Sequence, residues 1–230
     1  MSLILSIETS SNGCSVALHS EGKLLSNSEL FAERSSAEML TTLIQNVLFV
    51  SKKTFEDLDS LAISKGPGSY TGLRIGVSTV KGICFAKEIP LVSVNSLDIM
   101  IAQVPEFYDG LVCPMLDARR MEVYCKLTDS MGKEYMPTSA EIIDEIAFEE
   151  YLKEHKILFF GEGSEKCKTV IHNANALFLR KQIRPKAAYM GKIAHEKVRS
   201  LDYEDVSDFE PYYLKEFKGT QPTKNKKVTA

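Results

Sequence analysis

The feature that most constrains the fold is an order of strands and turns that occurs twice in the chain. An apolar run ends at Glu8, and a second strand-like stretch follows it as far as a turn at Gly22. The same order returns later, where an apolar run ends at Asp117 and an alternating stretch leads to a turn at Gly132. Glu8 and Asp117 are 109 residues apart, and the two glycines are 110 apart, in a chain of 230 residues. A repeat at half the chain length predicts two lobes of like fold, although any two β-hairpins share part of this pattern.

Helical and strand patterns alternate after the first hairpin. Apolar residues at helical spacing cover 40–48, a short strand pattern follows at 58–63, and a second helical stripe covers 70–86. Another strand pattern at 91–94 continues the alternation, which is typical of an α/β layer. We therefore expect an α/β fold of two lobes, each with a mixed sheet flanked by helices.

These patterns divide the chain into three parts. Residues 1–107 are expected to form the first lobe, and residues 108–218 the second, whose last helix can pack back on the first lobe. Helical patterns in the second part cover 165–175 and 187–201. The polar tail at 219–230 is expected to be disordered.

Charge and composition exclude several classes of protein. The formal net charge is −3, whereas a domain that binds nucleic acid by itself is usually strongly basic. No apolar run approaches the roughly 20 residues that a membrane span needs, and the N-terminal apolar run lacks the basic start of a signal peptide. The five cysteines are odd in number and form no CxxC pair, which indicates a reducing compartment. We therefore expect a cytoplasmic protein with no membrane contact.

Residues 64–82, SKGPGSYTGLRIGVSTVKG, have the glycines of a phosphate-binding loop. The Walker pattern GxxxxGK[ST] fails because no lysine follows the glycines, and GxGxxG fails because Thr71 stands where its last glycine is required. Ser69 or Thr71 can cap the following helix, and Gly72 and Gly76 lie four apart on one helical face, which lets another helix approach closely. We interpret the stretch as a turn, a cap and a docking helix, while the amides of the helix start leave an anion site open.

Other chemistries have little support in the residue pattern. The four histidines lack metal-ligand spacing: the HExxH pattern that begins at His195 fails at Arg199. There is no GxSxG sequence. Glu8 and Asp117, at the ends of matching strands, could face one cleft and organise a metal-bound nucleotide, or they could be structural turn acids. We therefore predict no catalytic residue and no metal site.

Four stretches together resemble the TsaB (YeaZ) family. They are LILSIETSSNGCSVAL, SKGPGSYTGLRIGVSTVKG, LDARRMEVY and PYYLK, and the likeness runs from Leu3 to about Lys215. The resemblance implies a duplicated actin-like, ribonuclease-H-like fold that is a degenerate copy of TsaD. TsaD carries an HxxxH metal motif, whereas residues 33–39 of this chain contain no histidine. By matching the two phosphate-loop positions, the resemblance gives as candidate cofactor contacts Glu8, Thr9, Asp117 and Arg119.

The resemblance also implies a function. Family members are non-catalytic scaffolds that activate a TsaD-type ATPase, joined by a TsaE-type ATPase, in the formation of N6-threonylcarbamoyladenosine at position 37 of tRNA. ATP, ADP and metal then belong to the partner ATPases, and the tRNA is reached only through the complex. Without a partner, the first two helices pair with those of a second copy as a homodimer. The partner-binding residues predicted here are Met39, Leu43, Gly72, Leu73, Arg74 and Gly76.

The alternative is an enzyme that acts on its own, either a small actin-fold phosphotransferase or a glycoprotease-like hydrolase. A phosphotransferase would use Glu8 and Asp117, but both lobes are short for a complete ATP cleft. A protease would need a metal or nucleophile site, which the sequence does not offer. Binding of tRNA by the chain alone is disfavoured by its net charge of −3.

Overall fold

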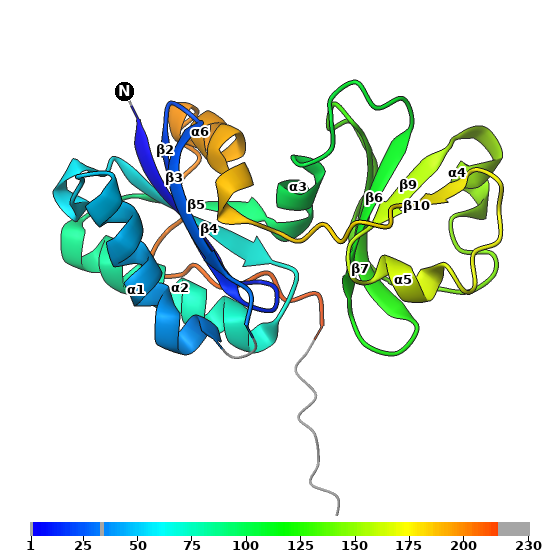
Figure 1. The fold of residues 1–230 in the computed structure, drawn as a ribbon, viewed down its shortest axis with the longest axis horizontal. Helices are drawn as coiled ribbons and strands as arrows, with labels where there is room; N and C mark the ends of the chain where they lie inside the picture. The colour runs from blue at the N-terminus through cyan, green and yellow to red at the C-terminus, as the bar shows by residue number, and fades with distance from the viewer. Residues whose placement is uncertain (1, 33–34, 216–230) are drawn as a thin grey trace, which may run out of the picture.

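The structure, a computed structural model, describes residues 2–32 and 35–215, which form two lobes side by side (Figure 1). The predicted disordered tail at 219–230 lies outside the described residues. Residues 33–34 of the histidine-free stretch also lie outside them.

The first lobe is built on a five-stranded mixed sheet with the order β3-β2-β1-β4-β5. The first three strands are antiparallel neighbours, and β4 and β5 run parallel to β1 because a helix precedes each of them. The strands are β1 (Leu3–Glu8), β2 (Cys14–Ser20), β3 (Lys23–Leu30), β4 (Ser60–Gly66) and β5 (Leu91–Asn95).

The second lobe repeats this topology. From one edge to the other its order is β8-β7-β6-β9-β10, with the first three strands antiparallel and the last two parallel to β6. The strands are β6 (Leu111–Asp117), β7 (Glu122–Asp129), β8 (Glu134–Ile142), β9 (Ile157–Phe160) and β10 (Ala176–Phe178). The prediction of two like lobes is confirmed, and the fold is the duplicated actin-like, ribonuclease-H-like one.

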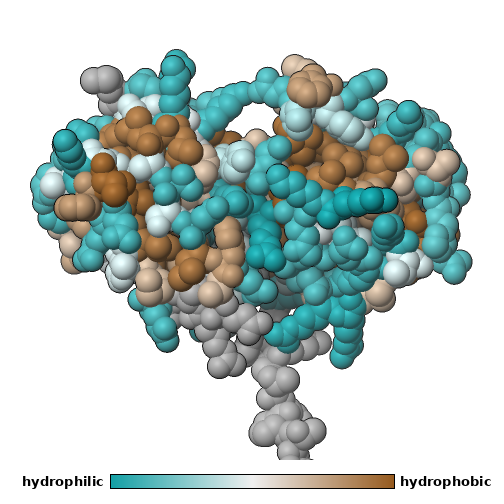
Figure 2. Space-filling view, viewed as in Figure 1, coloured by the Kyte–Doolittle hydropathy of each residue, from teal (hydrophilic) through white to brown (hydrophobic). Residues whose placement is uncertain are grey.

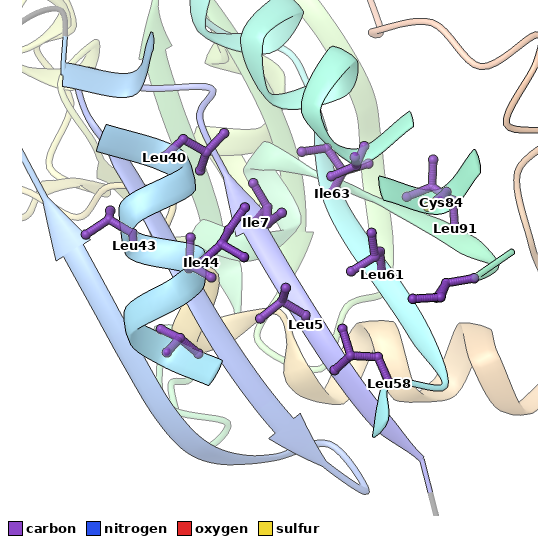
Figure 3. Close-up of a cluster of buried hydrophobic side chains, with 14 of the residues drawn as sticks. Leu5, Ile7, Leu40, Leu43, Ile44, Leu58, Leu61, Ile63, Cys84 and Leu91 are labelled. Atoms are coloured by element: carbon purple, nitrogen blue, oxygen red, sulfur yellow. The ribbon is translucent and has the colours of Figure 1, made fainter. Parts of the chain in front are cut away.

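Helices cover both faces of the first sheet. Successive residues of β1 point to opposite faces, so that Leu5 and Ile7 meet Leu40 and Ile44 of α1 on one side (Figure 3) while Ile4 packs on the other. α2 lies beside α1, and α6 covers the opposite face (Figure 1). The helices are α1 (Ser35–Val50), α2 (Tyr70–Lys87), α3 (Ser96–Ile101), α4 (Glu149–Glu154), α5 (Ser164–Cys167) and α6 (Gly191–Arg199), with 3-10 turns η1 (Phe55–Asp57) and η2 (Ala187–Tyr189).

The short helix α3 joins the lobes. Its Ile99 belongs to the cluster between the first sheet and α6, whereas its Leu97 packs on the second sheet. Asp98 accepts a 2.9 Å hydrogen bond from Lys126 Nζ of β7. Both sheets therefore share one element of secondary structure at their junction.

A C-terminal strap, residues 204–215, runs along the first lobe beside α2 (Figure 1). Phe209 is buried in the core, and Lys81 Nζ donates to the carbonyl of Phe209 at 3.1 Å. The peptide N–H of Tyr212 donates to the carbonyl of Lys65 at 2.7 Å. At its end, Lys215 forms an ion pair with Glu122 of the second lobe. The strap thus connects β4 and α2 of the first lobe with the first residue of β7.

Two predicted helices are shorter than expected. The pattern at 165–175 yields only α5, and farther along it the Asn173 side chain accepts from the Asn175 N–H in a turn. The pattern at 187–201 divides into η2 and α6. Within the described part of the chain, no helix has the length and apolar character to cross a membrane.

Candidate functional site

The turn after β1 encloses its own carboxylate. Glu8 is fully buried, and the Ser10 N–H donates to its Oε1 at 2.5 Å. The hydroxyl of Ser10 donates to the same oxygen, and that of Ser11 to Oε2 at 3.5 Å. Burial raises the pKa of Glu8 to about 7, against the opposing effect of these hydrogen bonds. The carboxyl is therefore directed into its own turn rather than toward a bound metal.

The glycine loop packs directly on this turn. The N–H of Ser69, the residue that caps α2, donates to the Ser10 carbonyl at 2.6 Å. A Cβ added at Gly72 would lie 2.0 Å from the Thr9 carbonyl, and one at Gly76 would lie 2.2 Å from Thr9 Oγ1. Gly72 and Gly76 thus do form a small-residue face on α2, but this face packs against the β1–β2 turn of the same lobe instead of a helix of another chain.

This packing corrects the predicted partner surface. Gly72 and Gly76 are buried against Thr9, and Leu43 and Leu73 are only 5% and 1% exposed in the interior. Figure 3 shows Leu43 among the side chains of this core. These four residues therefore belong to the interior of the first lobe. Helical spacing indicates which face of a helix is apolar, but it does not tell whether a partner or the chain's own lobe covers that face.

The two remaining predicted contacts are accessible. Met39 is half-buried, and Arg74 is exposed. The guanidinium of Arg74 lies 4.4 Å from the ring centroid of Tyr70, and its Nε donates to the Tyr213 hydroxyl at 3.4 Å. Tyr70 and Tyr213 are themselves 5.1 Å apart between ring centroids. Arg74 is therefore oriented by one aromatic residue at the start of α2 and one in the strap.

The outer surface of α1 and α2 carries uncovered apolar side chains. Phe49 is 82% exposed and Phe85 is 87% exposed, and Val50 is also exposed. We call these three residues the α1–α2 face; Figure 2 shows apolar surface on the lobe that carries these helices. An ion pair of 2.5 Å between Lys87 and Glu56 of η1 connects the end of α2 to the segment that follows α1. The sequence analysis did not single out Phe85. Its position outside the apolar stripe of α2 could have indicated an exposed aromatic side chain.

The turn after β6 is closed by an ammonium group. Asp117 accepts hydrogen bonds from Lys166 Nζ at 2.5 Å and from the Arg119 N–H at 2.8 Å. The same Nζ donates to the carbonyls of Arg120 and Glu122, both at 2.7 Å. Burial acts to raise the pKa of Asp117, but the hydrogen bonds from Lys166 and Arg119 outweigh it and hold that pKa below its usual value. Sequence reasoning missed Lys166, which is 49 residues from Asp117.

The four candidate cofactor contacts are thus engaged in turns or buried. Thr9 is buried and its Oγ1 has no hydrogen-bond partner, and Arg119 has a positive φ of 68° beside Asp117. In residues 2–32 and 35–215, no three His, Cys, Asp or Glu side chains are grouped so that they could hold a metal ion. Glu8 and Asp117 therefore both accept hydrogen bonds from groups of their own lobe.

Comparisons with known proteins agree on one family. The family model "TsaD: tRNA N6-adenosine threonylcarbamoyltransferase" matches residues 30–202. The "tRNA threonylcarbamoyladenosine biosynthesis protein TsaB" of Bacillus subtilis is 28% identical over 92% of this chain and 93% of its own length. The protein of the same name from Escherichia coli is 36% identical, over 53% of this chain and 52% of its own length.

Solved structures show the same fold. A protein described as similar to peptidase YEAZ from Pseudomonas aeruginosa has a TM-score of 0.82 at 23% identity, covering 94% of this chain and 100% of that one. The structure of "YeaZ from Pseudomonas aeruginosa" has a TM-score of 0.77 at 24% identity, covering 93% of this chain and all of its own.

Proposed function

Because the chain belongs to the TsaB (YeaZ) family, within the wider family that the TsaD model describes, we propose that it takes part in threonylcarbamoyladenosine biosynthesis as a non-catalytic scaffold. It binds and activates a TsaD-type ATPase, which moves the threonylcarbamoyl group to the tRNA adenosine. A TsaE-type ATPase joins this assembly, and ATP, ADP and metal belong to those partners. The tRNA is contacted through the complex.

The observation that carries this proposal is the exposure of Phe49 and Phe85 on the α1–α2 face. Burial of a large apolar side chain contributes about 2–3 kcal/mol, so uncovered aromatic residues on adjacent helices favour a protein partner. In the absence of TsaD, the same face of a second copy covers them as a homodimer. Arg74 lies on the same helix α2 and adds a charged group that a partner can contact.

The enclosed turns support the non-catalytic part of the proposal. A nucleotide enzyme of this fold needs donors and a carboxylate free to receive phosphate and metal. Here the Ser69 N–H is directed to Ser10, Glu8 is held by Ser10, and Asp117 is held by Lys166. These hydrogen bonds support the proposal, because the same groups would have to be released before they could bind phosphate or metal.

Reconstitution tests the proposal. The purified chain, a TsaD-type protein and a TsaE-type protein are incubated singly and together with threonylcarbamoyl-adenylate and tRNA, and the modified nucleoside is measured by chromatography. We expect no product from the chain alone and a higher rate when it is added to TsaD. Formation of product by the chain alone, at a rate that TsaD leaves unchanged, would refute the scaffold role. Calorimetry of the chain alone with Mg-ATP should give no binding heat.

A further inference from the structure

A groove in the second lobe has no role in the proposed function. It lies between the end of β8 and the segment that leads into α4, with a volume of about 240 Å³. Ile142 is 74% exposed and Ile146 is 68% exposed along its wall. Phe148 also lines it, and the ring of Phe148 packs against Phe159 of the core at 5.3 Å between centroids. The groove therefore has an apolar wall, one side chain of which packs on the core of the second lobe.

The rim of the groove is acidic. Its lining includes Glu141, Glu149 and Glu150 and no lysine or arginine. Residues 141–154 contain six carboxylates and one basic residue, Lys153, which is paired with Glu149 at 3.3 Å. A segment of this composition repels RNA and anionic lipid and attracts positive charge.

The groove also adjoins a free strand edge. β8 is the last strand of the second sheet, so β7 is the one strand that pairs with it within the described residues. Near its start, the hydroxyl of Tyr151 donates to the carbonyl of Tyr135 at 3.3 Å. Apolar side chains beside an unpaired edge and a single sign of charge are features of surfaces that bind peptide segments of other proteins.

We propose that this groove docks a positively charged, amphipathic segment of a separate protein. The apolar side chains of that segment cover Ile142 and Ile146, and its lysines or arginines face Glu149 and Glu150. The groove belongs to the second lobe and the α1–α2 face to the first, so the inference is independent of the proposed function.

A labelled probe peptide tests the inference. The probe is a 16-residue peptide of lysine and leucine, with leucines spaced to form one face of a helix, and its binding to the full chain is followed by fluorescence anisotropy. We expect saturable binding that weakens at least about 10-fold in the double variant Ile142→Ser/Ile146→Ser, because two exposed apolar side chains are removed. Glu149→Gln/Glu150→Gln should weaken binding about 5-fold at low salt and reduce its salt dependence. A peptide with glutamate in place of lysine should not bind.

Matched control variants distinguish binding in the groove from nonspecific binding to acidic or apolar surface elsewhere. Met131→Ser removes an exposed apolar side chain elsewhere on the second lobe, and Asp208→Asn/Glu210→Gln removes two carboxylates from the strap. Both should leave the affinity unchanged; a loss equal to that of the groove variants would overturn the proposal. A further variant changes Lys224, Lys226 and Lys227 to Ser in the full chain. If this variant bound the probe more tightly, the chain's own lysines would be the occupant of the groove, and the proposal would be overturned. Self-association lost in Ile142→Ser/Ile146→Ser would likewise overturn it in favour of a second copy.

Discussion

The peptide N–H of Ser69 donates a 2.6 Å hydrogen bond to the carbonyl of Ser10, which joins the start of α2 to the β1–β2 turn. In a nucleotide-binding loop, an amide at a helix start points to phosphate. Here it points to the chain's own backbone, and Gly72 and Gly76 allow the close approach. Gly72 and Gly76 thus serve the packing of α2 against the β1–β2 turn of the same lobe.

Replacement of Gly72 by alanine should destabilise the fold. The added Cβ would lie 2.0 Å from the Thr9 carbonyl, which is backbone and has little freedom to move. We expect Gly72→Ala to lower the free energy of unfolding by about 1–3 kcal/mol, as overpacking of a core does. Urea unfolding followed by circular dichroism measures the change.

Gly82 provides a matched control in the same helix. A Cβ there meets no atom within 4 Å. Gly82→Ala should raise the free energy of unfolding by about 0.5–1 kcal/mol through helix propensity alone. If both alanine variants were stabilised, the close packing of α2 on Thr9 would be wrong.

The buried Glu8 carboxyl should make stability depend on pH. Its folded pKa of about 7 lies above the ordinary value of 4.5, so the folded chain holds a proton that the unfolded chain releases between these values. Stability should therefore fall as the pH rises from 4.5 to 7, by about 3 kcal/mol in all. Glu8→Gln should remove most of this slope in urea unfolding at pH 5 and pH 8. The exposed Glu154→Gln should keep it, and equal slopes in all three proteins would contradict the assignment to Glu8.

The ammonium of Lys166 should hold the β6–β7 turn. Lys166→Met removes the ammonium donor to Asp117 and to two carbonyls, and we expect a loss of about 1–3 kcal/mol in unfolding free energy at pH 7. Because the folded pKa of Asp117 is lowered, its contribution exists above the ordinary value of 3.8 and is lost as the pH falls through the folded value. The difference in unfolding free energy between the unchanged chain and Lys166→Met should thus become smaller in acid. Lys153→Met, which breaks an exposed pair, should change stability by less than about 0.5 kcal/mol.

The sequence predicts the fold better than it predicts the contacts. Strand periodicity and the turns at Gly22 and Gly132 reveal the duplicated sheets, since these signals are local. The burial of Leu43 and Leu73 within the lobe depends on tertiary structure. Helical spacing indicates an apolar face, but it does not tell whether a sheet or a partner covers that face. The Lys166–Asp117 pair joins residues far apart in the chain, and no local pattern indicates it.

Replacement of Phe85 by serine should weaken the complex with a TsaD-type partner and leave the monomer folded. Phe85 is 87% exposed, so its removal costs little in the isolated chain, whereas an aromatic residue at the centre of an interface contributes about 1–3 kcal/mol to binding, or roughly 5- to 150-fold in Kd. Phe49→Ser should act in the same direction. Calorimetric titration of each variant with the partner measures the effect, and circular dichroism verifies the fold. Phe107→Ser is the matched control, because Phe107 is equally exposed but lies in the loop before β6. If Phe107→Ser weakened the complex and Phe49→Ser and Phe85→Ser did not, the partner surface would lie away from α1 and α2.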